Sequence, residues 1–183
     1  MLDLLQMHKY FISQHLKEGD TVVDYTMGNG HDTLYLSKAV GETGRVYAFD
    51  VQQAALDSTA KLLKDEGAPE NYRLILDSHE NALNYISEPV KVGVFNLGWL
   101  PGSDKSVTTR RSSTLPAVKA AISLMDHDGL LLIAVYPGHE EGRLEGEMLS
   151  EYLATISRFD RCVARLQIIN SPTSPFFFVI ERK

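Results

Sequence analysis

The sequence predicts a doubly wound α/β fold with a seven-stranded, mostly parallel sheet that ends in an antiparallel hairpin. Short apolar runs alternate with segments of helical periodicity along most of the chain, which is the pattern of repeated βαβ units. The runs are apolar on both faces, so helices are expected on each side of the sheet. Two further runs near the end lie too close together for a helical crossover and are expected to pair antiparallel.

The elements are expected in the following order. Apolar residues at helical spacing predict an amphipathic helix over residues 3–17, which Gly19 ends. Parallel strands are predicted over residues 21–25, 45–51, 72–76, 90–97 and 130–136, with crossover helices that include residues 52–66 and 114–125. The closing hairpin is predicted from residues 163–169 and 176–181. Residues 98–113 form one long loop, and long loops in compact domains are often functional.

The hairpin ending separates this chain from an ordinary dinucleotide-binding fold, which closes with another crossover helix and a parallel strand. It favours the methyltransferase variant of the Rossmann-like fold. With 183 residues, the chain is expected to form a single domain over 1–183.

The composition is that of a soluble globular protein, with 44% hydrophobic and 23% charged residues. The net charge of −6 gives no general attraction to phosphate, so a nucleic-acid partner would need a local basic patch. Cys162 is the sole cysteine, which excludes a disulfide within the chain and favours a reducing cytoplasm. We expect no export signal and no membrane span, because no apolar run is long enough.

A glycine turn follows the first predicted strand. Gly28-Asn29-Gly30 comes directly before a helical pattern that opens at Leu34. Glycines at a strand-to-helix turn let a ligand approach the backbone and meet the positive end of the helix. A structural turn without a ligand is the alternative, but the first βα turn is where doubly wound sheets bind ligands.

The second strand ends at Asp50, 20 residues after Gly30, which is the spacing at which a carboxylate meets ribose hydroxyls. This suits S-adenosylmethionine or NAD. The third glycine of a dinucleotide motif would stand at position 33, where this chain has Thr33. The chain therefore lacks one of the glycines that form the pyrophosphate-binding site of a dinucleotide. The methionine group of adenosylmethionine can use loop N–H groups and Asp32, although Asp32 is equally well explained as a charge that complements the helix dipole.

Polar residues also end the third and fourth strands. Asp77-Ser78-His79 can bind an adenine amino group or cap the next helix. Asn96, followed three positions later by Trp99, resembles the Asn-Pro-Pro-Tyr motif of amino-group methyltransferases. Leucine and glycine replace both prolines, so the motif alone does not fix an amine as the acceptor. Trp99 is suited to stack on a base, and packing is the alternative.

These motifs together resemble the family known as putative rRNA methylases, which includes the MnmM-type tRNA methyltransferases. The segments that carry the resemblance are residues 24–33, Asp50-Val-Gln52, Asp77-Ser-His79, residues 96–105 and Tyr136-Pro-Gly-His139. The resemblance covers nearly the whole chain. It implies methyl transfer from S-adenosylmethionine to the aminomethyl nitrogen of a modified uridine, 5-aminomethyl-2-thiouridine, at the wobble position of the tRNA anticodon. A homodimer is a further expectation.

The resemblance also implies roles for individual residues. The residues expected to bind the cofactor are Met27, Gly28, Asn29, Gly30, Asp32, Asp50, Gln52, Asp77, Ser78, His79 and Asn96. The residues expected at the reacting atoms are Asn96, Trp99 and Asp32. Those expected to contact RNA are Lys105, Arg110, Arg111 and His139, with Lys119 nearby; a solvated basic surface is their alternative explanation. No ligand spacing indicates a metal. His8, His31, Asp32 and His139 are possible proton acceptors.

Other readings of the sequence stay open. An NAD-dependent oxidoreductase is disfavoured by Thr33 and by the terminal hairpin. A nucleotide-binding module without catalysis is compatible with the same motifs, because methyl transfer needs no distinctive nucleophile. An rRNA or small-molecule methyltransferase differs from the tRNA enzyme only in its acceptor.

Overall fold

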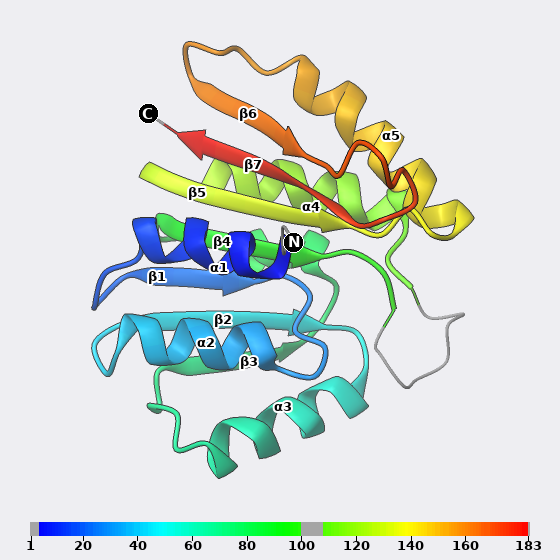
Figure 1. The fold of residues 1–183 in the computed structure, drawn as a ribbon. Helices are drawn as coiled ribbons and strands as arrows, with labels where there is room; N and C mark the ends of the chain where they lie inside the picture. Colours follow the sequence, from blue (N-terminus) through cyan, green and yellow to red (C-terminus); the bar gives the residue numbers. More distant parts are fainter. Residues whose placement is uncertain (1–3, 100–107, 183) are drawn as a thin grey trace.

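The computed structural model describes residues 4–99 and 108–182. Its strands form one seven-stranded sheet in the order β3-β2-β1-β4-β5-β7-β6 (Figure 1). The strands are β1 (Thr21–Asp24), β2 (Arg45–Asp50), β3 (Tyr72–Leu76), β4 (Val90–Asn96), β5 (Met125–Val135), β6 (Arg161–Leu166) and β7 (Phe176–Arg182). β1 to β5 are parallel, and β7 runs antiparallel to both β5 and β6. The predicted doubly wound sheet with a reversed hairpin is confirmed.

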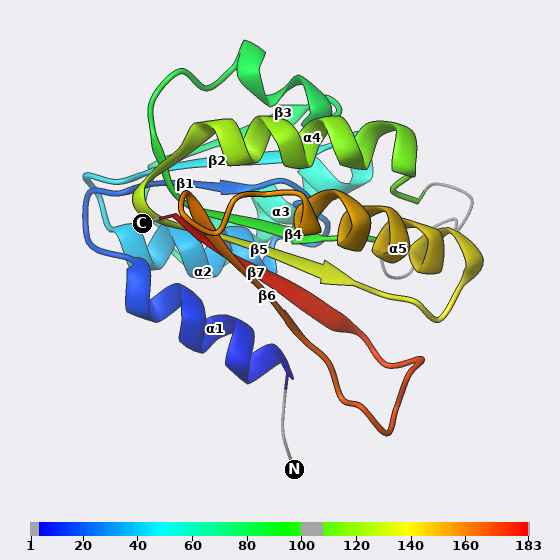
Figure 2. The same ribbon diagram turned by 90° about the horizontal axis from the view of Figure 1, so that it is seen from above.

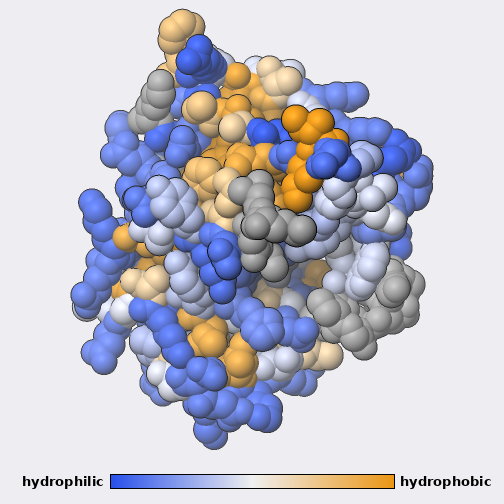
Figure 3. Space-filling model, viewed as in Figure 1, coloured by the Kyte–Doolittle hydropathy of each residue, from blue (hydrophilic) through white to orange (hydrophobic). Residues whose placement is uncertain are grey.

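Helices cover both faces of the sheet. They are α1 (Leu4–His15), α2 (His31–Val40), α3 (Gln53–Asp65), the 3-10 helix η1 (His79–Asn84), α4 (Arg111–Leu124) and α5 (Glu140–Ala154). α1 and α2 lie on one face and α4 and α5 on the other (Figure 2). Each face has its own apolar core. On the face with α1, apolar side chains gather over β5 and β7 beside that helix (Figure 3). No helix among the described residues is both long and apolar enough to cross a bilayer.

The element boundaries differ from the sequence prediction at three places. β5 begins at Met125, directly after α4, and its pairing with β4 is irregular between Val90 and Val92. β6 spans Arg161–Leu166, a few residues earlier than expected. The sequence did not single out α5, because this helix packs closely through small residues. A Cβ on its Gly146 would come within 2.9 Å of the Phe176 ring, so glycine stands where an amphipathic helix would carry a large apolar side chain.

Candidate active site

A cavity of about 930 Å³ opens at the carboxyl edge of the parallel strands. This is the place where open α/β sheets bind ligands. Its lining includes the predicted residues Met27, Gly28, Asn29, Asp32, Asp50, Gln52, Asp77, Ser78, His79, Asn96, Trp99, Arg110 and His139. Gly30 is buried in the loop behind this lining, and Arg111 lies outside it. Lys105 falls outside the described residues. The sheet thus brings residues from separate parts of the sequence to one cavity.

The glycine turn is shaped by its own backbone and by α3. Gly28 and Gly30 have φ values of 53° and 83°, a left-handed conformation that favours glycine. The Thr59 hydroxyl donates a hydrogen bond to the Gly28 carbonyl oxygen at 3.1 Å. A Cβ on Gly30 would lie 2.7 Å from the same hydroxyl oxygen. The turn therefore presents its backbone to the cavity and admits no side chain at position 30.

Substituting Gly30→Ala is expected to weaken cofactor binding and to destabilise the fold. The added methyl group must displace Thr59, and alanine is strained at this φ. The cost is on the order of 1–3 kcal/mol. Thermal unfolding and adenosylhomocysteine titration of the variant measure both effects, and Gly67→Ala is the control, since φ is also positive there but a Cβ meets nothing within 4 Å. Equal losses in the two variants would contradict the packing argument.

Asp50 closes the loop against the end of β2. Its Oδ2 accepts the Gly28 N–H at 3.0 Å and its Oδ1 accepts the Gln52 N–H at 3.0 Å. Each carboxylate oxygen has a second lone pair that can accept another hydrogen bond. Asp50 lines the cavity, so two vicinal hydroxyls of a ribose are suitable donors. The same carboxylate can thereby shape the loop and bind a ligand.

The Asp77-Ser78-His79 segment also lines the cavity. Several of its polar groups form hydrogen bonds within the protein. Asp77 accepts hydrogen bonds from Asn81 Nδ2, the Tyr85 hydroxyl and the Ser78 N–H, and these lower the pKa of its carboxyl group. Ser78 is the N-cap of η1 by position, but its side chain makes no capping hydrogen bond, so the capping alternative is not confirmed. His79 Nδ1–H donates to the Tyr25 carbonyl oxygen at 3.0 Å, which joins this segment to the end of β1.

Asn96 is held in a defined orientation. Its backbone N–H donates to Thr26 Oγ1 at 2.6 Å, and its side-chain Nδ2 donates to Asp32 Oδ2 at 2.7 Å. A carboxylate accepts hydrogen bonds but does not donate them, so the NH₂ group must face Asp32. The amide oxygen is then the atom left to accept an N–H from a molecule in the cavity. Asp32 lies in the first turn of α2, so it also complements the helix dipole.

A buried carboxylate lies beneath the loop. Asp24, at the end of β1, is 0% exposed; it accepts hydrogen bonds from the Thr33 hydroxyl at 2.7 Å and from the Thr26 N–H at 3.1 Å. The pKa of Asp24 is raised to about 7, mainly by burial and then by the nearby Asp32, against the opposing effect of the Thr33 hydrogen bond. Thr33, which replaces the third glycine, therefore has a structural partner in this fold.

The raised pKa of Asp24 predicts a pH-dependent stability. Between its ordinary pKa of about 4 and its folded value of about 7, the folded chain holds a proton that the unfolded chain has lost. The contribution of Asp24 to the free energy of unfolding therefore falls as pH rises through this window and levels off above it. Asp24→Asn removes the titration, so its stability relative to the original chain should rise between pH 4 and pH 8. Urea unfolding at several pH values tests this, and a pH-independent difference would contradict it.

Trp99 and His139 form an aromatic wall of the cavity. Their ring centroids are 4.6 Å apart at an interplanar angle of 53°. His139 is the N-cap of α5, and its Nδ1 accepts the Gly142 N–H at 3.1 Å. The ring is therefore fixed by the helix that follows it. A planar ligand that enters between this wall and Asn96 would meet an aromatic surface.

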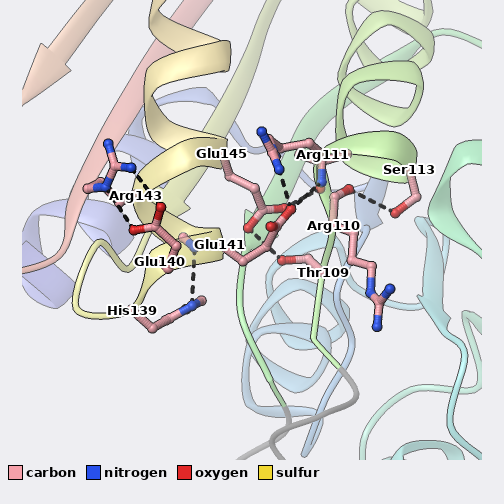
Figure 4. Close-up of polar contacts among 11 residues, drawn as sticks. Thr109, Arg110, Arg111, Ser113, His139, Glu140, Glu141, Arg143 and Glu145 are labelled. Carbon is pink, nitrogen blue, oxygen red and sulfur yellow. Dashed lines mark hydrogen bonds and ion pairs between the residues drawn. The ribbon is translucent and has the colours of Figure 1, made fainter.

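The predicted basic residues differ in what they contact. Arg111 pairs with Glu141 on α5 at 3.2 Å, whereas the Arg110 side chain points away from that pair (Figure 4). Lys119 lies over the Tyr152 ring at 5.2 Å, and this contact is consistent with its alternative reading as a surface residue. Arg110 is exposed and lines the cavity, so among the described members of this group it is best placed for a ligand phosphate.

Sequence reasoning missed several residues of the cavity. Thr26 fixes the Asn96 backbone, Tyr136 follows β5, and Thr173 and Pro175 reach the lining from the turn between β6 and β7. Thr26 and Tyr136 stood inside motifs, but neither was given a role there. The turn residues carry no signal, because their position depends on the antiparallel order of β5, β7 and β6. The described residues contain no cluster of His, Cys, Asp or Glu that could hold a metal ion.

Comparisons with known proteins place this geometry in context. The chain is 36% identical to an Arabidopsis thaliana protein named tRNA (mnm(5)s(2)U34)-methyltransferase, chloroplastic, over 93% of this chain and 66% of that protein. The chain thus spans just under two thirds of this relative's length.

Two solved structures match over the full length of this chain and 99% of theirs. One, described as a putative rRNA methylase from Clostridium thermocellum, has a TM-score of 0.97 at 38% identity. The other, described as a putative methyltransferase from Streptococcus mutans in complex with SAH, has a TM-score of 0.91 at 34% identity. The model of the family described as "Putative rRNA methylase" matches residues 46–182. The chain belongs to this family, whose Rossmann-like methyltransferase fold it shares.

Proposed function

We propose that this protein is an S-adenosylmethionine-dependent methyltransferase that methylates the aminomethyl nitrogen of 5-aminomethyl-2-thiouridine at the wobble position of tRNA. The observation that carries the proposal is the Asn96–Asp32 hydrogen bond of 2.7 Å, which leaves an amide oxygen to accept an N–H in the cavity. The name of the Arabidopsis relative, which specifies a wobble uridine, supports the choice of acceptor.

The residues around the glycine loop fit adenosylmethionine. SAH, which the Streptococcus mutans structure contains, is this cofactor without its transferred methyl group. Asp50 offers two oxygens to the ribose hydroxyls, and the Gly28–Gly30 turn exposes backbone to the methionine group. His79 Nε2 is buried and has no partner among the described residues. Burial lowers the pKa of His79, so its neutral ring offers a hydrogen-bond acceptor on the adenine side.

The chemistry requires alignment more than activation. A bound sulfonium supplies a methyl group that is already activated for displacement, so no metal is required for the transfer. The Asn96 amide oxygen would accept one N–H of the neutral amine and direct its lone pair along the line of attack. The alkyl amine is protonated in water and must lose that proton to become the neutral nucleophile, and His8, which lines the cavity and is 5% exposed, is a candidate acceptor. The pKa of His8 is lowered by burial, which favours its neutral form.

The target base would enter from the aromatic side. Trp99 and His139 offer ring surfaces on which an unstacked base can lie, as single-stranded nucleic acids do on aromatic side chains. Arg110 at the cavity edge would contact the phosphate backbone, which positions RNA without reading its sequence. Cytoplasmic location and a homodimer stay predictions from the sequence.

Substituting Arg110→Ala is expected to weaken tRNA binding and to flatten its salt dependence. The slope of log affinity against log salt should shrink by about one contact's worth, roughly 0.7 to 0.9. Arg111→Ala should change the slope less, because Glu141 already pairs with that side chain. Arg143→Ala is the control, since this exposed arginine pairs with Glu140 and Glu147 away from the cavity lining. If the slope is unchanged in Arg110→Ala, the RNA path lies elsewhere.

Methyl transfer from labelled adenosylmethionine to purified RNA fractions tests the proposal as a whole. We expect label in tRNA that carries the aminomethyl group and much less in tRNA without it. Label confined to rRNA, or to small amines, would assign a different acceptor. Absence of label in every fraction, together with tight binding of adenosylhomocysteine, would indicate a binding module.

A further inference from the structure

A buried carboxylate on α5 reaches across to the loop that carries Trp99. Glu145 is 0% exposed, and its two oxygens accept hydrogen bonds from threonine hydroxyls of different segments. Oε1 accepts from Thr114 on α4 at 2.5 Å. Oε2 accepts from Thr109, before α4, at 2.9 Å, and Figure 4 shows this second contact. Burying a carboxylate costs free energy, and hydrogen bonds offset only part of that cost. The two threonine hydroxyls provide this partial compensation for Glu145.

Thr109 connects Glu145 by hydrogen bonds to Gly98, just after the end of β4. Its hydroxyl donates to Glu145 and also accepts the Gly98 N–H at 2.9 Å, while its own N–H donates to the Gly98 carbonyl oxygen at 2.9 Å. Trp99 and Thr108 form an isolated antiparallel bridge beside this pair. The two described ends of the segment between β4 and α4 are therefore joined to each other and, through Thr109, to α5.

The same helix carries the other half of the aromatic wall. His139 caps the start of α5 and contacts the Trp99 ring, while Glu145 lies further along the helix. A second tie runs from α5 to the start of α4, where Glu141 Oε1 accepts the Arg111 N–H at 3.1 Å. The single helix α5 thus holds His139 directly, and it is linked to the segment that carries Trp99 through Thr109.

We propose that Glu145 is a positioning residue that acts through Thr109 and Gly98 to hold the Trp99 ring against His139 at the acceptor end of the cavity. The effect on tRNA rests on the proposed function, in which these rings receive the target base. The link from Glu145 to Gly98, the residue before Trp99, does not, because it consists of hydrogen bonds within the protein. Glu145 lies outside the cavity lining and would touch neither the cofactor nor the reacting atoms, whereas Thr109 is part of the lining.

Trp99 is the sole tryptophan of the chain, so intrinsic fluorescence reports on this position. Thr109→Val removes the hydroxyl that links Glu145 to Gly98 and should shift the emission of Trp99 and raise its quenching by acrylamide. Thr109→Ser keeps the hydroxyl and should restore the original signal. Thr114→Val is the matched control, because it removes the other hydrogen bond to the same carboxylate and leaves the link to Gly98 intact.

The kinetic expectation separates positioning from stability. Thr109→Val should raise KM for tRNA about tenfold, which corresponds to 1.4 kcal/mol, with little change in cofactor affinity. Thr114→Val should lower thermal stability to a similar degree and leave KM for tRNA near its original value. Equal fluorescence and equal KM in the two variants would reduce Glu145 to a structural residue and overturn the proposal.

The two readouts also distinguish the failure of this inference from the failure of the proposed function. A Trp99 signal that changes in Thr109→Val, in a protein that does not methylate tRNA, would support the link and refute the assigned acceptor. An unchanged Trp99 signal, in an active protein, would refute the link alone. Glu145→Gln is a second probe, because glutamine keeps one acceptor oxygen for two hydroxyls and should give an intermediate shift.

Discussion

Asn96→Ala is expected to lower the rate of methyl transfer by roughly a hundredfold or more, with a much smaller change in cofactor affinity. The Asn96 side chain donates to Asp32 at 2.7 Å, so its oxygen is pre-set to accept the amine N–H. Orientation of this kind contributes mainly in the transition state, where the lone pair, the methyl carbon and the departing sulfur must lie in line. Single-turnover rates at saturating cofactor and tRNA measure the loss.

A structural role for Asn96 gives a different pattern. If the side chain only supports the end of β4, its loss should lower stability and should affect binding and rate together. The backbone N–H bond to Thr26 does not depend on the side chain, so the strand end should persist in the variant. Asp32→Asn is the informative partner variant, because an amide at position 32 no longer dictates which atom of Asn96 faces it. Near-normal transfer by folded Asn96→Ala would remove this residue from the proposed site.

Asp50→Ala is expected to weaken adenosylmethionine binding on the order of 1.5–3 kcal/mol for each charge-assisted hydrogen bond lost. The structure adds a second cause, because Asp50 also accepts the Gly28 and Gln52 N–H groups that shape the loop. Calorimetric titration with adenosylhomocysteine measures the loss, and NADH in the same titration tests the dinucleotide alternative.

The control for this effect is Asp57→Ala. Asp57 is an exposed carboxylate on α3 that accepts a hydrogen bond from Gln53 Nε2 at 2.8 Å, and it does not line the cavity. Removing it changes the net charge by the same amount without touching the proposed ribose site. An unchanged dissociation constant in folded Asp50→Ala, or an equal loss in Asp57→Ala, would contradict the assignment.

The fold was predictable because its signals are local. Apolar runs alternate with helical segments, and the short connection before β7 excludes a crossover, so the parallel sheet and its reversed ending follow from the sequence pattern. α5 is the exception, since Gly142 and Gly146 stand where large side chains would reveal its buried face. The start of β5 at Met125 was missed because Asp126, His127 and Asp128 interrupt the apolar pattern in that part of the strand.

The cavity was predictable only where its residues follow a strand end. Asp50, Asp77 and Asn96 were found because the carboxyl ends of parallel strands meet at one edge. The partners of Asn96 and the buried state of Asp24 could not be read from the sequence, since they depend on how α2 and β4 sit around the loop. Glu145 looks like any other acidic residue of a charged helix, and only the packing of α5 against α4 shows that it is buried.

Mass spectrometry of tRNA nucleosides tests the central claim most directly. tRNA that carries 5-aminomethyl-2-thiouridine would be incubated with adenosylmethionine and either the protein or its Asn96→Ala variant, and then digested to nucleosides. The proposed function predicts that the aminomethyl nucleoside is replaced by a species heavier by one methylene, with the methyl group on the side-chain nitrogen in the fragment ions. It also predicts little conversion by the variant. An unchanged aminomethyl nucleoside with active protein, or a methyl group on the ring or the ribose, would contradict it.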